Sequence, residues 1–105
     1  MIDRLRQLAI FAKAVETGSF RGAAKVLNLS PSVVSHHISK LEGDLGVALL
    51  YRSTRKLSLT ENGEKLLRSA QEMVAAAESG LDDISAGSVE PAGAEARRVA
   101  RRSSG

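Results

Sequence analysis

The stretch SPSVVSHHISKLE, residues 30–42, carries the side chains of this sequence that are best suited to chemistry. Its serine hydroxyls and two adjacent histidines suggest three kinds of site: a metal centre, an activated nucleophile, or a surface that hydrogen-bonds nucleic acid. Its apolar residues recur at steps of three and four, which indicates a helix with one buried side. The polar residues then occupy the opposite side.

The metal and enzyme interpretations find little support in the rest of the sequence. Neighbouring side chains such as His36 and His37 point about 100° apart on a helix, and no cysteine, further histidine or suitable carboxylate joins them. Ser35 and His36 diverge for the same reason and do not form a dyad. The sequence also has no Gly-rich phosphate loop. We therefore expect no metal, no cofactor and no enzymatic activity.

The charge distribution favours a polyanionic partner. Residues 1–60 carry nine Lys/Arg and four Asp/Glu, whereas residues 61–90 carry two Lys/Arg and seven Asp/Glu. A basic first part indicates nucleic acid. No apolar run approaches the roughly 18 residues of a membrane span, and the N-terminal residues carry mixed charge unlike a signal peptide. The 105 residues are therefore expected to form one small cytoplasmic domain with an appendage.

A first helix is expected over residues 3–17. Asp3 is a plausible N-cap, and Gly18 is a plausible end. Apolar residues at three- and four-residue steps form one stripe along it. The stripe consists of Leu5, Leu8, Phe11, Ala12 and Val15.

A second, shorter helix is expected directly after it. Ser19 is its candidate N-cap, and Asn28 suits the left-handed backbone that ends a helix. Two adjacent alanines allow another helix to approach closely. The expected buried residues are Phe20, Ala23, Ala24 and Leu27.

The third helix contains the opening stretch. Ser30 is its expected N-cap, Pro31 occupies the first helical position, where its missing N–H costs nothing, and Gly46 ends the helix. The predicted buried stripe is Val34, Ile38, Leu41 and Leu45. The predicted outward side is Ser32, Ser35, His36, Ser39 and Gly43, with Val33, His37 and Lys40 on one flank.

Beyond Gly46 the spacing of the apolar residues changes. Two runs, 47–51 and 57–60, flank the basic segment 52–56, which indicates a β-hairpin. Thr60 is expected to cap a long helix over residues 61–86 whose apolar residues form a heptad seam. The seam either packs on its own chain or, as its regularity favours, pairs with a second copy, because an isolated helix of this length is marginal in water. The seam residues are Leu67, Ala70, Val74, Ala77, Leu81 and Ile84.

Two short helices joined by a tight turn, with a polar outer face on the second, make a helix-turn-helix. The sequence of residues 11–67 has further specific motifs. They are Phe11, the Gly18-Ser19-Phe20 turn, Ala23-Ala24, Leu27, Ser35, Ile38, Leu41-Glu42, Leu45-Gly46, Arg52, Arg55, and Leu59-Thr60 with Gly63. With these motifs the chain resembles the DNA-binding domain and linker helix of LysR-type transcriptional regulators, over about residues 3–86.

The resemblance implies a mainly α fold: a winged helix-turn-helix in residues 1–60, with three helices and a small β-hairpin wing, followed by a linker and dimerisation helix in residues 61–86. Residues 87–105 lack periodicity, and we expect a disordered tail there. The family's large effector-binding domain is not expected in this chain, and neither is a small-molecule effector site. A cut fragment, a shifted reading frame in a GC-rich gene, and a naturally short regulator are three hypotheses for this.

The resemblance and the outward helix face together predict the DNA-binding residues. Val33 would pack on a thymine methyl group, and His36 stands where the family often has arginine. Pro31 replaces a frequent glutamine of the family, and Glu42 is expected to brace the fold. Cations in the hairpin turn favour the minor groove or flanking phosphates. The predicted residues are Ser30, Pro31, Ser32, Val33, Ser35 and His36 in the helix, and Arg52, Ser53, Arg55 and Lys56 in the turn.

The favoured hypothesis is a sequence-specific transcriptional regulator that binds an interrupted inverted repeat in double-stranded DNA as a homodimer. The alternative is a helical interaction module whose seam binds another protein and whose DNA binding is lost. Removing charge at Arg52 and Arg55 would distinguish the two, since only the first hypothesis expects an effect. Changes at Leu67 and Leu81 would matter under both.

Overall fold

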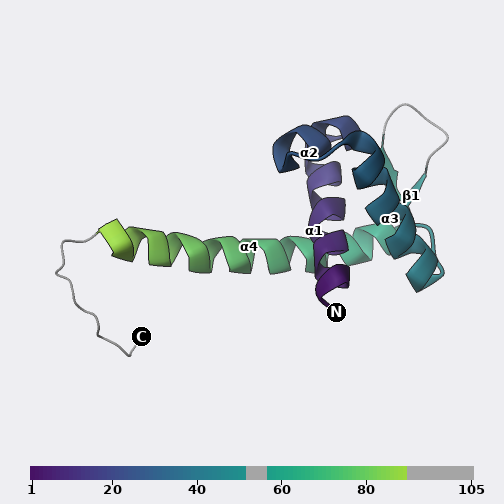
Figure 1. Ribbon diagram of the computed structural model, residues 1–105. Coiled ribbons are helices and arrows are strands. Elements are labelled where there is room, and N and C mark those ends of the chain that lie inside the picture. The colour runs from purple at the N-terminus through teal and green to yellow at the C-terminus, as the bar shows by residue number, and fades with distance from the viewer. Residues whose placement is uncertain (52–56, 90–105) are drawn as a thin grey trace. The chain divides into compact units, whose positions relative to one another are not determined.

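The computed structural model describes residues 1–51 and 57–89, which form four helices and two short strands (Figure 1). Residues 1–74 form one compact unit, and residues 75–89 belong to a second. The fold is the expected, mainly α-helical, winged helix-turn-helix followed by a long helix. In chain order the elements are α1 (Ile2–Thr17), α2 (Phe20–Leu27), α3 (Pro31–Leu45), β1 (Leu50–Tyr51), β2 (Ser58–Leu59) and α4 (Glu61–Val89).

The predicted C-terminal ends of the first three helices are confirmed. Gly18 and Gly46 follow α1 and α3 with positive φ angles of 83° and 74°, and Asn28 follows α2 with a φ of 60°. Glycine and asparagine tolerate this left-handed backbone best. Their amides donate to carbonyls of the preceding helical turn, as the amide of Gly46 does to the carbonyl of Glu42 at 2.8 Å. Each of these three helices is therefore ended by its own local sequence.

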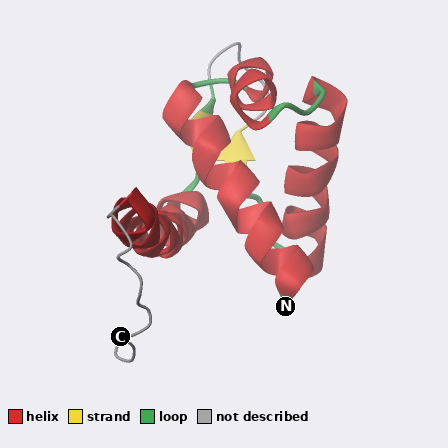
Figure 2. Ribbon diagram, turned by 60° about the vertical axis from the view of Figure 1, so that its left-hand side comes forward, coloured by secondary structure: helices red, strands yellow, loops and turns green. Residues whose placement is uncertain are grey.

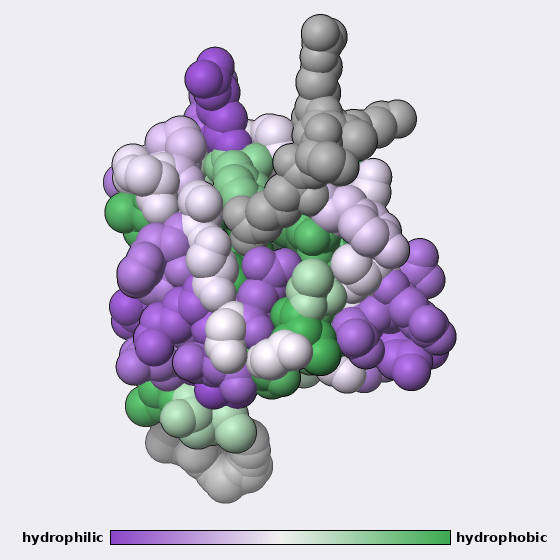
Figure 3. Space-filling model, turned by 90° about the vertical axis from the view of Figure 1, so that its right-hand side faces the viewer, coloured by the Kyte–Doolittle hydropathy of each residue, from purple (hydrophilic) through white to green (hydrophobic). Residues whose placement is uncertain are grey.

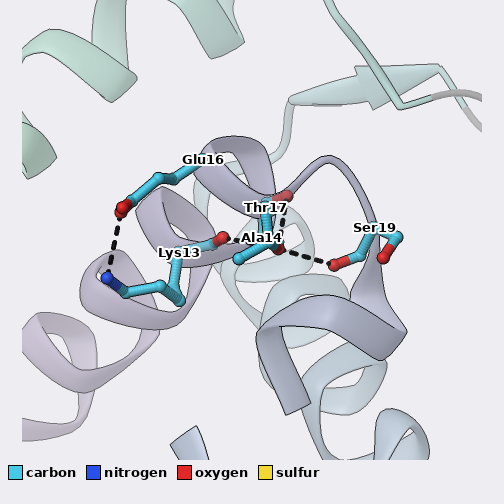
Figure 4. A network of polar contacts seen from close by, with 5 residues as sticks. All are labelled: Lys13, Ala14, Glu16, Thr17 and Ser19. Carbon is cyan, nitrogen blue, oxygen red and sulfur yellow. Dashed lines mark hydrogen bonds and ion pairs between the residues drawn. The ribbon is translucent and has the colours of Figure 1, made fainter. Parts of the chain in front are cut away.

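The start of α2 is fixed at the corner between α1 and α2 (Figure 4). The Ser19 hydroxyl accepts a hydrogen bond from the amide of Gly22 at 2.8 Å, as an N-cap should. The Thr17 hydroxyl lies within donating distance of the carbonyls of Lys13 and Ser19, at 2.9 and 3.1 Å. These contacts help to fix the tight turn between the two helices.

The hydrophobic core lies where α1, α2 and α3 meet (Figure 2). The two adjacent alanines of α2 are buried, so α2 approaches its neighbours closely, as predicted. Phe20 and Leu27 pack against the edge of this core. The buried core residues are Ile10, Phe11, Ala14, Ala23, Ala24, Val34, Ile38, Leu41, Leu49 and Leu50.

The predicted stripe of α1 is partly wrong. Leu5 is exposed, whereas Gln7, Ile10 and Ala14, which were not predicted, are buried. Apolar residues lie on more than one side of α1, and both α2 and α3 pack against it, so the helix is enclosed over a broad surface. The Oε1 atom of Gln7 is buried without a hydrogen-bond partner within the described residues.

Two further predictions at helix ends are corrected. Asp3 lies inside the first turn of α1, which begins at Ile2 after Met1, so Asp3 is not the N-cap. Leu45 is exposed although Val34, Ile38 and Leu41 of the same stripe are fully buried. As the last residue of α3, Leu45 extends past the core and borders an open, mostly apolar groove.

The small sheet is shorter than the predicted hairpin. β1 and β2 pair antiparallel, with Leu50 opposite Leu59 and Tyr51 opposite Ser58. The basic segment 52–56 between them lies outside the described residues.

The start of α4 is tied to the chain before β1. Thr60 donates through its amide to the Leu49 carbonyl at 3.0 Å and through its hydroxyl to the Ala48 carbonyl at 2.7 Å. The same hydroxyl accepts from the amide of Gly63 at 3.0 Å, which confirms the predicted cap. A Cβ atom on Gly63 would lie 2.1 Å from the Leu49 carbonyl oxygen, so only glycine allows this contact.

The predicted seam of α4 divides into two parts. Ala70 is fully buried within its own chain and Leu67 packs against the core, so the first part of the seam serves the domain itself. Ala77, Leu81 and Ile84 are exposed, the last two with 65% and 72% of their surface accessible. The helix also continues to Val89, three residues past its predicted end at 86, while residues 90–105 lie outside the described residues.

Candidate nucleic-acid interface

The N-terminal half of α3 presents most of its predicted site residues to solvent. Pro31, Ser32, Val33 and His36 are exposed, and so is the capping residue Ser30. Ser35 is half-buried, because it lies closer to the core side of the helix. The face of the molecule in Figure 3 shows mainly hydrophilic residues around a smaller apolar area. The structure thus brings six predicted residues together on one short helical surface: Ser30, Pro31, Ser32, Val33, Ser35 and His36.

The first turn of α3 is held by Ser30. Its hydroxyl oxygen accepts a hydrogen bond from the amide of Val33 at 3.2 Å and lies 3.2 Å from the hydroxyl of Ser32. The cap was predicted, but the contact with Ser32 was not; the spacing Ser-Pro-Ser is the signal that would have suggested it. Ser30 therefore positions the first turn of α3. The hydroxyl of Ser32 is exposed at the same end of the helix.

The two histidines do not converge on a ligand. Their rings meet edge to face, with centroids 6.0 Å apart and planes at 66°. His36 is exposed and His37 is half-buried. Within the described residues, no three His, Cys, Asp or Glu side chains gather where they could hold a metal ion.

The two acids near this surface both interact with other groups of the protein. Between residues 17 and 60 the sequence contains two acids, Glu42 and Asp44. One carboxylate oxygen of Glu42 accepts from the amides of Leu49 and Leu50 at 2.8 and 3.2 Å, which confirms that Glu42 braces the fold. The Oδ2 atom of Asp44 lies 3.5 Å from Nη2 of Arg4 and 3.7 Å from Nζ of Lys40.

Exposed cations surround the same region. Arg21 and Lys25 lie on the exposed side of α2, and Lys40 lies on α3. Together α2 and α3 carry these three cations and two acids, Glu42 and Asp44, so their net charge is positive. The four predicted residues of the hairpin turn, Arg52, Ser53, Arg55 and Lys56, lie outside the described residues.

Among residues 1–51 and 57–89, no helix is both long enough and apolar enough to cross a membrane.

The sequence matches known regulators over most of its described length. The sequence model of the bacterial regulatory helix-turn-helix proteins of the LysR family matches residues 5–64. An uncharacterized HTH-type transcriptional regulator of Sinorhizobium fredii, y4mQ, is 51% identical over 81 residues, which are 77% of this chain and 27% of that protein. The chain spans about a quarter of the length of the curated relatives it matches.

Solved structures agree with the sequence matches. The BenM DBD, solved in a complex with catB site 1 DNA, is similar with a TM-score of 0.71 and 28% identity, over 82% of this chain and 96% of that one. The CbnR DBD, solved in a complex with DNA, is similar with a TM-score of 0.65 and 36% identity, over 80% and 97% of the two chains. In sequence and in fold, this chain belongs to the LysR family of bacterial regulatory helix-turn-helix proteins.

Proposed function

We propose that this chain is a dimeric transcriptional regulator that binds an interrupted inverted repeat in double-stranded DNA, and that it acts in the cytoplasm. The observation that carries the proposal is the outer face of α3, where exposed small polar groups and a histidine lie together without an unpaired acid. Similar DBD structures are solved in complexes with DNA, which supports the same kind of partner here.

The N-terminal half of α3 enters the major groove in this proposal. Ser32, Ser35 and His36 donate or accept hydrogen bonds at base edges, where each base pair displays its own pattern of donors and acceptors. Ser30 and Ser32, at the start of the helix, face a phosphate, because a helix N-terminus favours negative charge. Phosphate contacts orient the helix, and base contacts select the sequence.

The basic segment 52–56 supplies contacts beside the groove. Arg52, Arg55 and Lys56 bind flanking phosphates or enter the minor groove, and Ser53 adds a hydrogen bond. Arg21 and Lys25, both exposed on α2, contribute further phosphate attraction. Each such contact releases counterions, so binding falls steeply as salt is added.

Dimerisation uses the exposed part of the α4 seam. Leu81 and Ile84 leave most of their surface in water, and Ala77 lies one turn before Leu81 on the same stripe. A second copy of α4 would bury this stripe in both chains. Since a symmetric dimer places two α3 helices on the duplex, its site is an inverted repeat with a spacer. Val74 lies at the boundary between this part of the seam and the part that the domain buries, which includes Leu67 and Ala70.

Selection of binding sites from a random duplex pool tests this function. The full chain at moderate salt should enrich an inverted repeat, and His36→Ala should relax the preference at one position of each half-site. Sedimentation of the same sample should show a dimer. A dimer that enriches no sequence would instead support the alternative, a helical module that binds another protein through α4.

A further inference from the structure

An open groove lies between the end of α3 and the start of α4, within the compact unit of residues 1–74. Leu45 and Val47 leave 40% and 37% of their surface in water there, while Leu49 is buried and Leu66 is half-buried. The volume of the groove is about 330 Å³, which is the liquid volume of roughly ten water molecules. Its lining residues are Leu45, Val47, Leu49, Asn62, Lys65, Leu66 and Ser69. The domain thus keeps a hollow, largely apolar surface in contact with water.

The exposed end of the α4 seam needs an apolar surface to cover it. Leu81 and Ile84 are exposed, and the first part of the seam in a second copy cannot receive them. Ala70 is fully buried within its own domain, and Leu67 packs against that domain's core. In a dimer the two exposed ends must therefore cover either each other or a different surface.

Charge disfavours the packing of the two ends against each other. At about 100° per residue, Glu78 and Asp82 lie on one side of the pair Leu81 and Ile84, and Asp83 lies on the other side. All three acids are exposed. Two such ends packed together would bring three carboxylates from each copy into one small interface, and juxtaposed like charges are unfavourable.

The groove offers the complementary charge. Of the seven described residues that line it, Lys65 alone is charged, and its side chain is exposed on α4. Asn62 and Ser69 add uncharged polar groups on the same helix. An apolar hollow beside an ammonium group matches an apolar pair flanked by carboxylates in both polarity and charge.

We propose that Leu81 and Ile84 of one copy dock into this groove of a second copy, with the flanking acids near Lys65. The inference rests on the proposed dimer and identifies the surface that receives its seam. Twofold symmetry makes the same contact twice, once in each direction. Docking removes apolar surface of both copies from water, which drives the association. Because Leu45 is the last residue of α3, the contact also braces the partner's helix that is proposed to read DNA.

Cross-linking between two different variants tests the contact. The chain contains no cysteine, so introduced thiols are the only ones that react. Full chains with Val47→Cys and with Ile84→Cys are mixed, allowed to exchange subunits and treated with a short bis-maleimide. The mixture should give a covalent dimer, and either variant alone should give only traces. Ser79→Cys, on the other side of α4, is the control and should not cross-link to Val47→Cys.

An added acid in the groove gives a second measurement. Val47→Asp places a carboxylate where the partner's acids dock, so sedimentation equilibrium should show dimerisation weakened by at least about tenfold. The variant should fold, because Val47 is exposed in the single chain. Val26→Asp makes the same change at an exposed valine of α2 and should leave the dimer intact.

Two results would overturn the inference and leave the proposed dimer standing. One is a dimer in which Ile84→Cys cross-links to itself but not to Val47→Cys, which would mean that the two α4 ends cover each other. The other is a dimer that Val47→Asp does not weaken. A chain that sediments as a monomer would contradict the proposed dimer, and the inference with it.

Discussion

A carboxylate oxygen of Glu42 lies 2.8 Å from the amide nitrogen of Leu49, seven residues further along the chain. The same oxygen accepts from the next amide, that of Leu50, at 3.2 Å. The pair joins the last turn of α3 to the start of β1, and so connects the helix proposed to read DNA to the base of the hairpin. These hydrogen bonds also engage one of the two acids near that surface with the protein's own backbone.

We expect Glu42→Ala to lower the free energy of unfolding by about 2–3 kcal/mol, because two charge-assisted hydrogen bonds are lost and two amides are left without an acceptor. Glu42→Gln should cost less, since its carbonyl oxygen can still accept. Urea unfolding measures both. Glu16→Ala removes an exposed ion pair with Lys13 and should cost at most about 1 kcal/mol. Equal losses for Glu42→Ala and Glu16→Ala would contradict this role.

Gly63→Ala should destabilise the domain by at least about 2 kcal/mol, because the new methyl group would overlap the Leu49 carbonyl and force α4 away from it. Gly43→Ala is the control on α3, where the added methyl group meets nothing within 4 Å. Alanine favours helix over glycine, so this control should gain up to about 1 kcal/mol. Thermal unfolding measures both variants. Melting temperatures that shifted in the same direction for both would refute the prediction.

The double variant Leu81→Ala with Ile84→Ala should weaken dimerisation by roughly a hundredfold or more, since both copies lose apolar surface from the proposed interface. Sedimentation equilibrium measures the change. Unfolding of residues 1–74 should be unaffected, because both side chains are exposed in the single chain. Ser79→Ala, an exposed change on the other side of α4, should leave the dimer intact. A dimer that survives the double variant would place the interface elsewhere.

Replacing Arg52 and Arg55 by glutamine should weaken binding by a similar factor on all duplexes and reduce the slope of log affinity against log salt by about 1 for each lost phosphate contact. Fluorescence anisotropy at several salt concentrations gives both quantities. Arg68→Gln, an exposed change on the acidic helix α4, is the control and should alter neither. A changed sequence preference without a changed slope would mean that these arginines read bases.

Features that depend on local interactions could be predicted from the sequence. Ser19, Ser30 and Thr60 cap their helices through hydrogen bonds that reach three residues along the chain. Gly18 and Gly46 end α1 and α3 because their own backbones adopt the left-handed conformation. These signals act within one turn of helix, so the order of the elements and the outward side of α3 followed from residue type and spacing.

Tertiary structure decided which apolar surface each helix buries. The periodicity of α1 favoured Leu5, but the packing of two helices against it buried Gln7 instead. The regular step of α4 could not reveal that Ala70 faces its own domain while Leu81 stays exposed. Periodicity identifies a stripe of apolar residues, whereas the partner that covers the stripe depends on contacts between residues far apart in the chain.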